Sequence, residues 1–305
     1  ALPRSPTRQD IEQLCSEHGL DQVPRVALGS RLFTDSLPAP PDDSLMPPTG
    51  GWSEKTAEQV TLLARAEAEG VMGAALKQNP ALRQRMEIVT KCDIVIDAGR
   101  HSGTRVKHYD TTEKHIQESV NASLSEMGIA HIDVLLIHRP DPMMDHHEAG
   151  AALDGLVDSG KVRAVGASNF RPWDWNMLQS AMRHPLVTNQ IELSLKTIAP
   201  FTNGDLAFHQ QHDHVVMAWS PLGGGDLMTT DGELGNRLDS IAVRYGADRA
   251  AVATAFLLAH PAEITPVLGT NNLERIGQIA DALTIEIDRQ DWFWLYEAAL
   301  GHEVP

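Results

Sequence analysis

The sequence predicts an α/β fold, a single (β/α)8 TIM barrel, and three observations lead to this fold class. From residue 85 onward, strand-like and helix-like segments alternate with little interruption. The strand-like segments are apolar throughout, as in parallel sheets that are buried on both faces. No linker rich in proline, glycine and serine divides them, and 305 residues suit one such barrel. We therefore expect one domain over residues 1–305, with a divergent part, 1–84, and a regular part, 85–305.

The expected elements of the regular part follow one another along the chain. Strands are expected where short apolar runs occur, at residues 87–91, 133–138, 164–168, 187–190, 215–219 and 265–268. Helices are expected where apolar residues recur at helical spacing, at residues 147–159, 173–182, 203–212, 236–245, 248–259, 272–282 and 288–300. A further helix is expected after Asp110, because Glu113 three residues later completes a capping-box pattern.

The divergent part has fewer regular patterns. Residues 26–29 are apolar enough for the first barrel strand, and residues 56–77 form a helix pattern rich in alanine, glutamate and leucine. Residues 31–50 are rich in proline and contain no strand-like run. We therefore expect an atypical N-terminal segment in place of a clear second strand.

Composition excludes several classes of partner. Twenty-five basic and 41 acidic residues give a net charge of −16, which argues against binding nucleic acid or an anionic membrane. Cys15 and Cys92 lie far apart and match no metal spacing, as expected for a reduced, cytoplasmic protein. No signal peptide or membrane span is recognisable. The histidine-rich segments 146–147 and 209–214 lack neighbouring strand-end carboxylates, so no metal is expected.

Candidate catalytic residues lie where two expected strands end. One strand ends at Lys91, and the strand over residues 133–137 is followed by His138 and then by prolines that turn the chain. Parallel barrels place their chemistry at the carboxyl ends of strands. His108 and Tyr109 lie in the loop after the Lys91 strand, which opens on the same face. These four residues are the candidates for catalysis.

Two loops are typical of a phosphate cradle. Residues 219–225 contain three successive glycines, whose backbone can approach a ligand closely. Residues 268–272 open a helix whose amides favour an anion, and Arg275 in that helix could pair with a phosphate. Barrels of this class often bind phosphate with the loops after strands seven and eight. Turns that only connect elements, and a surface arginine, are the simpler alternatives.

Four further side chains could bind a planar ring with a carboxamide. Ser168 and Asn169 end one strand, and Gln190 ends the next. Their hydroxyl and amide groups could hydrogen-bond a carboxamide, although such residues also cap helices. Trp219 could stack on a ring, although tryptophan at this place is equally common in a core.

With these motifs, the sequence resembles the aldo-keto reductase family, which reduces carbonyls with NADPH on a (β/α)8 barrel without a metal. It is most similar to the bacterial and fungal oxidoreductase branch that carries a His-Arg-Pro-Asp-Pro signature. The motifs are residues 90–92 (TKC), 136–142 (LIHRPDP), 160–163 (GKVR), 166–170 (GASNF), 189–192 (NQIE), 219–225 (WSPLGGG) and 269–272 (GTNN).

The resemblance implies roles for individual residues. In the family, an aspartate, a tyrosine, a lysine and a histidine form the catalytic site, and Lys91 and His138 match the last two. The resemblance assigns the nicotinamide carboxamide to Ser168, Asn169 and Gln190, and the ring to Trp219. The phosphate and adenosine side would fall to Ser220, Leu222, Gly223, Gly269, Thr270, Asn271 and Arg275. Because no basic residue stands at 270–272, NAD(H) remains open beside NADP(H).

The sequence departs from the family at the other two catalytic positions. The usual Asp-x-Ala-x-x-Tyr-Gly motif is absent before the helix at 66–77, and no tyrosine precedes Lys107. We therefore expect an NADP(H)-dependent oxidoreductase that acts on a carbonyl of a small molecule with a non-standard proton donor. His138 could donate, or His101, His108 or Tyr109 from the following loop.

Two other classes of function stay open. The first alternative is a non-redox enzyme on the same barrel, an isomerase, dehydratase or cyclase of specialised metabolism, since a rebuilt second strand would suit a new substrate. The second is a binding or regulatory subunit that keeps the cofactor as a sensor. In each case a small molecule is the expected partner, and the expected protein is a monomer or weak homo-oligomer.

Overall fold

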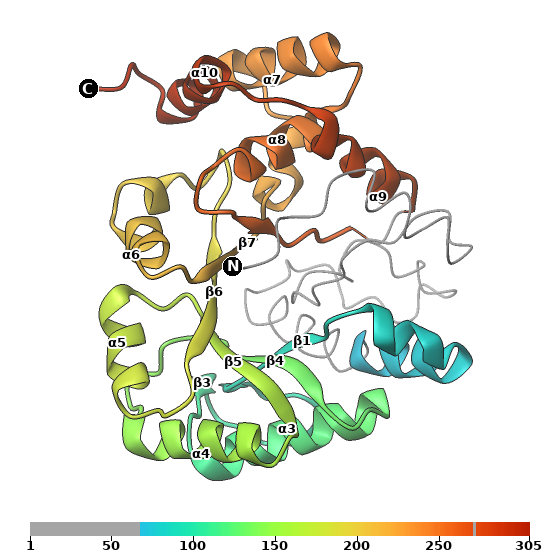
Figure 1. Cartoon of the computed structure of the whole chain (residues 1–305), viewed down its shortest axis with the longest axis vertical. Coiled ribbons are helices and arrows are strands. Elements are labelled where there is room, and N and C mark those ends of the chain that lie inside the picture. Colours follow the sequence, from blue (N-terminus) through green and yellow to red (C-terminus); the bar gives the residue numbers. More distant parts are fainter. Residues whose placement is uncertain (1–67, 271–272) are drawn as a thin grey trace. The chain divides into compact units, whose positions relative to one another are not determined.

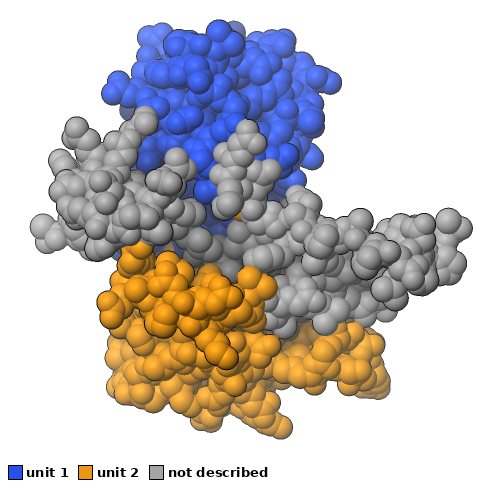
Figure 2. Space-filling model, turned by 90° about the vertical axis from the view of Figure 1, so that its right-hand side faces the viewer, with its two compact units in different colours: residues 1–26, 192–268, 272–305 blue, residues 27–191, 269–271 orange. Residues whose placement is uncertain are grey.

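The computed structural model describes residues 68–270 and 273–305, and these residues divide into two compact units (Figure 2). The N-terminal unit, orange in Figure 2, contains the described residues 68–191 and 269–270. The C-terminal unit, blue, contains residues 192–268 and 273–305. Each unit is described by itself.

Four parallel strands form the sheet of the N-terminal unit, which is shown in Figure 1. In spatial order they are β1 (Val89–Cys92), β4 (Ile132–Ile137), β5 (Val162–Ser168) and β6 (Leu186–Glu192). Helices α3 (Glu113–Met127), α4 (His146–Asp158) and α5 (Pro172–Ser180) connect them. Residues 68–78 are helical and lead through the 3-10 helix η2 (Pro80–Arg85) into β1.

A short hairpin interrupts the connection from β1 to α3. It consists of β2 (Ile94–Val95) and β3 (His108–Tyr109), which pair antiparallel, with the 3-10 helix η3 (Gly99–His101) between them. The sequence did not predict this hairpin, because two-residue strands are too short for an alternating pattern.

The N-cap of α3 corrects one expectation. Thr112, not Asp110, is the N-cap residue, and its side-chain oxygen accepts a hydrogen bond from the backbone N–H of His115 at 3.3 Å. The Asp110 carboxylate instead accepts hydrogen bonds from the Thr112 N–H, at 3.0 Å, and hydroxyl, at 2.6 Å. Asp110 thus forms the turn before the helix, because an aspartate side chain can accept from the backbone two residues further on as well as cap a helix.

The middle of the sheet depends on a close approach between strands. A Cβ on Gly166 would lie 2.5 Å from the carbonyl oxygen of Thr188 in β6 and 2.8 Å from Leu136 Cδ2 in β4. Only glycine leaves room for these neighbours. The sheet is otherwise filled by fully buried aliphatic residues, including Leu135, Ile137 and Val165.

The C-terminal unit has two parallel strands, β7 (Val215–Trp219) and β8 (Thr265–Pro266), and several helices. The helices are α6 (Asp205–Gln211), α7 (Gly232–Tyr245), α8 (Arg249–Leu258), α9 (Leu273–Ile279) and α10 (Arg289–Leu300), with the 3-10 helices η4 (Ala199–Phe201), η5 (Gly223–Met228) and η6 (Ala280–Thr284). Each strand expected from residue 87 onward is present, with bounds that differ by a few residues.

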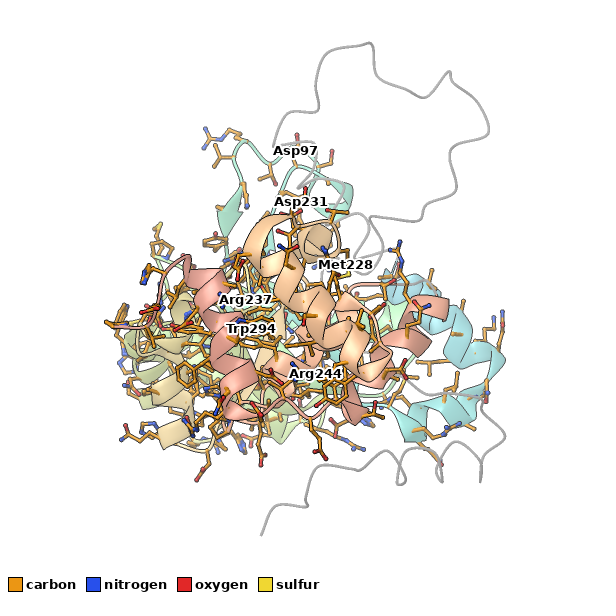
Figure 3. All side chains as sticks on the ribbon, turned by 90° about the horizontal axis from the view of Figure 1, so that it is seen from above. Asp97, Met228, Asp231, Arg237, Arg244 and Trp294 are labelled. Carbon is orange, nitrogen blue, oxygen red and sulfur yellow. The ribbon has the colours of Figure 1, made fainter. Side chains whose placement is uncertain are left out.

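Helices α7 and α10 lie side by side in this unit (Figures 1 and 3). The Arg237 guanidinium lies 5.2 Å from the centre of the Trp294 ring and donates to the Trp294 carbonyl oxygen. Further along α7, Arg244 forms an ion pair with Asp291 of α10. Cation–π and ion-pair contacts therefore hold the last helix in place.

Two expectations fall partly or wholly outside the described residues. The strand expected at residues 26–29 lies outside them, as does the N-terminal half of the helix expected at 56–77; its remainder, from residue 68, is helical. Within residues 68–270 and 273–305, no helix is both long and apolar enough to cross a membrane.

Candidate active site

Lys91 and His138 lie on one face of the sheet, where their strands end. Lys91 of β1 pairs with Leu136 of β4, and His138 lies two residues beyond Leu136. Since side chains alternate between the faces of a strand, Lys91 and His138 share a face. The His138 N–H donates to the Cys92 carbonyl oxygen at 3.1 Å, which continues the ladder to the histidine. Both side chains are buried, with exposed fractions of 3% and 8%.

Ser168 and Gln190 extend the same face across the next two strands. Leu136 pairs with Gly166 of β5, so Ser168, two residues further on, points to the face of Lys91. Ser168 itself pairs with Gln190 of β6. Both are buried. Adjacent parallel strands thus end in a lysine, a histidine, a serine and a glutamine on one face, which is the arrangement that an active site needs.

Backbone and side-chain hydrogen bonds fix these strand ends. The Asn169 amide nitrogen donates to the His138 carbonyl oxygen at 3.3 Å and to Ser168 Oγ at 2.9 Å, and Ser168 Oγ donates to the Gln190 carbonyl oxygen at 2.9 Å. Asn169 has a φ of 62°, a left-handed conformation that asparagine tolerates better than most residues. Because its backbone N–H also donates to the Gln190 carbonyl oxygen at 2.9 Å, Asn169 connects the ends of three strands.

Asp93 also lies at this edge, and sequence reasoning missed it. It follows β1 directly, has a φ of 99° and is 1% exposed. Its carboxylate accepts from the Arg139 N–H at 2.9 Å, and its carbonyl oxygen accepts from the Asp110 N–H at 2.8 Å. The sequence signal that could have identified Asp93 is its position, two residues after the lysine at the end of the strand. Asp93 joins the end of β1 to the segment after His138 and to the hairpin.

The two loop candidates, His108 and Tyr109, lie in strand β3 of that hairpin. The Tyr109 backbone pairs with Ile94, two residues after the end of β1, and Tyr109 is half-buried. His108 is exposed, and its Nδ1 lies 3.0 Å from the Val106 carbonyl oxygen. The hairpin thus brings Tyr109, rather than His108, into a partly enclosed position next to the strand ends.

His101, a further possible proton donor, belongs to a different cluster. Its ring lies 5.5 Å from that of His115, and its Nε2 accepts from the Arg100 guanidinium at 3.0 Å. Burial, followed by the charge of Arg100, lowers the pKa of His101 below its ordinary value. A neutral imidazole that already accepts from an arginine is a poor proton donor at neutral pH.

The candidate phosphate loop in the C-terminal unit has an unusual backbone. Trp219 ends β7 half-buried, and Ser220 follows with a φ of 51°. Gly223, Gly224 and Gly225 also have positive φ angles, of 60°, 69° and 102°. Positive φ at a serine is uncommon and marks a strained turn of the kind found at binding sites. The loop therefore fits close backbone approach to a ligand.

The remaining predicted cofactor residues follow β8 in the chain, lie in α9 or precede η5. Gly269 is exposed, Thr270 is half-buried, and Arg275 in α9 is exposed; Leu222 is half-buried at the start of η5. Asn271 lies outside the described residues.

The C-terminal unit also contains a cluster of three histidines, His209, His212 and His214. His209 is fully buried, with its Nδ1 3.3 Å from His214 Nδ1, and the His212 and His214 rings stack 5.4 Å apart. Burial, and then the charges of His214 and His212, lower the pKa of His209 to about 4. In the described part of the chain, no group of three or more histidine, cysteine, aspartate or glutamate residues could hold a metal ion.

Comparison with known proteins identifies the family. The model of the aldo/keto reductase family matches residues 64–298. The chain belongs to this family. The match includes the helical residues 68–78, so it extends N-terminal to residue 85, where the expected regular part begins.

Individual relatives agree with this assignment. A 6-dehydroglucose reductase of Agrobacterium fabrum is 58% identical over 252 residues, which cover 82% of this chain and 84% of the relative. An uncharacterized oxidoreductase of Bacillus subtilis is 40% identical, covering 78% of this chain and 81% of the relative. The chain is therefore an oxidoreductase of the aldo-keto reductase type.

A solved structure supports the predicted fold class. The glycerol dehydrogenase of Gluconobacter oxydans has a TM-score of 0.69 at 19% identity, covering 79% of this chain and 80% of that chain. At this identity the likeness concerns the fold. The predicted α/β fold, the TIM barrel of the aldo-keto reductases, is confirmed.

Proposed function

We propose that this protein is an NADP(H)-dependent reductase for an aldehyde or ketone of a small organic molecule, and that the substrate is an oxidised sugar. The observation that carries the proposal is the row of buried polar side chains on one face, Lys91, His138, Ser168 and Gln190, at the ends of four adjacent parallel strands. The sugar is suggested by the name of the Agrobacterium fabrum relative, 6-dehydroglucose reductase.

The residues of this face suit a carbonyl substrate. A buried ammonium and a buried imidazole can stabilise the negative charge that develops on a carbonyl oxygen, more strongly than in water, because the low-polarity surroundings screen it less. The hydride for reduction would come from a bound nicotinamide dinucleotide. Ser168, Asn169 and Gln190 present hydroxyl and amide groups that suit its carboxamide, and Asn169 is oriented by two hydrogen bonds to neighbouring strand ends.

We propose His138 as the proton donor in place of the family's tyrosine. His138 is 8% exposed and shares its face with Lys91, whereas His108 is exposed. Tyr109 remains the candidate among the tyrosines, because Tyr245 and Tyr296 lie in α7 and α10, where Tyr245 donates to the Glu286 carbonyl oxygen and Tyr296 stacks on Trp292. A proton donor whose pKa lies near the operating pH typically raises the rate by about 10²–10⁴-fold.

The remaining proposals concern the setting of the reaction. We propose a cytoplasmic enzyme, a monomer or weak homo-oligomer, whose 305 residues form one barrel domain. The net charge of −16 supports a freely diffusing protein with a small-molecule partner. NAD(H) is the alternative cofactor.

The test is a reductase assay with purified protein, NADPH or NADH, and a panel of sugar aldehydes that includes 6-dehydroglucose. We expect cofactor oxidation to match product formation, a loss of about 10²-fold or more in His138→Gln, and a smaller loss in Tyr109→Phe. If Tyr109→Phe abolishes turnover and His138→Gln does not, Tyr109 is the donor. Product formed without cofactor oxidation would instead show a non-redox enzyme.

A further inference from the structure

Lys196 lies in a tight turn directly after β6, and this turn is hydrogen-bonded to the end of β7. Ser194 and Thr197 form the turn by pairing antiparallel, and Ser194 Oγ accepts from the Lys196 N–H at 3.1 Å. The Leu193 N–H donates to the Trp219 carbonyl oxygen at 3.3 Å. All of these residues belong to the C-terminal unit. The backbone of Lys196 is thus fixed beside the strand that opens the glycine loop.

The aliphatic part of Lys196 lies across Gly223 of this loop. A Cβ added to Gly223 would lie 2.6 Å from Lys196 Cγ and 3.2 Å from Lys196 Cβ. Gly223 also has a φ of 60°, which favours glycine. The loop therefore has a glycine where the stem of a lysine passes over its backbone, and the ammonium of this exposed lysine is three bonds beyond the contacting Cγ atom.

The ammonium of Lys196 has no competing partner among the residues that the structure describes. Lys196 is exposed and forms no ion pair or side-chain hydrogen bond within residues 68–270 and 273–305. By contrast, Arg249 in the same unit pairs with Asp239 and with the Thr230 carbonyl oxygen. A cation held by its stem and not paired can bind an anion.

We propose that Lys196 binds the diphosphate group of the nicotinamide dinucleotide. Three observations support this assignment: the positive φ of Ser220 and Gly223, the lysine stem packed on Gly223, and the absence of a basic residue from 270–272. A protein with a net charge of −16 repels a dinucleotide, so a cation at the phosphate loop offsets an unfavourable field. The proposal rests on the proposed function, since it assumes that this loop binds the cofactor.

The test measures dissociation constants for NADPH and NADH by fluorescence, without turnover. Lys196→Met keeps the length of the stem and removes the charge, and we expect it to weaken both cofactors by about 10-fold, as for the loss of one charged hydrogen bond. Lys196→Arg should bind within about 3-fold of the wild type. Lys161→Met is the matched control, because Lys161 precedes β5 at the amino end of its strand and donates to Asn121.

The outcomes separate this inference from the proposed function. If the wild-type protein binds neither cofactor, the proposed function fails, and Lys196 with it. If the wild type binds and Lys196→Met binds equally well, the inference about Lys196 fails alone. If Lys196→Met weakens NADPH but not NADH, the lysine contacts the 2′-phosphate, and its assignment to the diphosphate is wrong. A loss that also occurs in Lys161→Met would reflect net charge only.

A double-mutant cycle tests whether Gly223 acts through Lys196. Gly223→Ala should weaken cofactor binding by about 10-fold, since its Cβ displaces the lysine stem. In a Lys196→Ala background, where the Cγ atom is absent, Gly223→Ala should weaken binding by about 3-fold or less, because only the backbone strain remains. Equal losses in both backgrounds would overturn the link between the two residues. Melting temperatures of all four proteins show which changes come from folding.

Discussion

The two ends of the sheet in the N-terminal unit both contain buried charge, but they use it differently. At the amino end, Asp133 accepts from the Ile88 N–H at 2.8 Å and pairs with Arg83 at 2.7 Å, with His131 and Arg163 each 3.6 Å away. At the carboxyl end, Lys91 and the strand-end residues beside it lie in a row along one face. The first arrangement neutralises a carboxylate, whereas the second collects groups of different chemistry.

This difference is the one expected of a barrel enzyme. Buried charge is costly unless it is paired, so a compact ion-pair cluster at the amino end is a structural device. In the proposed function, the polar residues gathered on one face at the carboxyl end serve chemistry, since that is where barrels hold their substrates. The two ends should therefore respond in opposite ways to substitution: one should lose stability and the other activity.

The largest effect is expected for Lys91→Met. We predict a loss of about 10²–10⁴-fold in kcat/KM, because the substitution removes the buried cation that we propose to stabilise charge on the carbonyl oxygen. The melting temperature should change less than in Asp133→Asn, since methionine keeps the buried aliphatic stem in place. Steady-state kinetics and thermal unfolding of the same preparation check both parts. Activity within about 3-fold of the wild type, together with lower stability, would give Lys91 a structural role.

The opposite pattern is expected for Asp133→Asn. This change leaves the Arg83 guanidinium without its carboxylate partner and weakens the acceptor of the Ile88 N–H, so the free energy of unfolding should fall by about 3 kcal/mol. The kcat/KM of the folded fraction should stay within about 2-fold. Urea unfolding measures the free energy of unfolding, and steady-state kinetics at urea concentrations below the unfolding midpoint measure kcat/KM. A loss of activity without a loss of stability would contradict the division between the two ends.

The histidine cluster of the C-terminal unit predicts an acid effect that is independent of both ends. Burial, followed by the charges of His214 and His212, lowers the pKa of His209 to about 4, below the 6.5 of an unfolded histidine. Between pH 6.5 and 4 the unfolded chain therefore binds more protons, and stability falls as the pH falls, by about 2–3 kcal/mol. Above pH 6.5 the cluster should have no effect. His209→Gln should flatten unfolding free energies measured over this range, and an unchanged slope would contradict the assignment.

Much of the fold could be predicted from the sequence because its signals are local. The strands from Val89 onward are apolar runs, and α10 begins after Asp288, where its helix was expected. The N-cap of α3 was predicted wrongly at Asp110, because Thr112 two residues later offers the same chemistry. The β2–β3 hairpin gave no periodic signal.

Only those candidate site residues that lie at the ends of strands could be predicted from the sequence. Lys91, His138, Ser168 and Gln190 were found because each stands where an apolar run stops, and the register then puts them on one face. Asp93 was missed because its importance comes from a φ of 99° and from hydrogen bonds to residues far along the chain. Lys196 was missed for a similar reason, since its contact with Gly223 spans a whole β/α unit.

The smallest effect is expected for Asn169→Gly, which tests how the carboxyl end is held together. Glycine keeps the left-handed backbone, with its φ of 62°, but removes the hydrogen bonds to the His138 carbonyl oxygen and Ser168 Oγ. We expect the free energy of unfolding to fall by about 1 kcal/mol and cofactor binding to weaken by a few-fold, because the strand ends lose a shared partner. Asn169→Asp is the control, since it keeps the side-chain shape and an acceptor but loses the donor. If both substitutions leave stability and cofactor affinity unchanged, the strand ends hold their positions without Asn169, and the order of the carboxyl end comes from the backbone ladder alone.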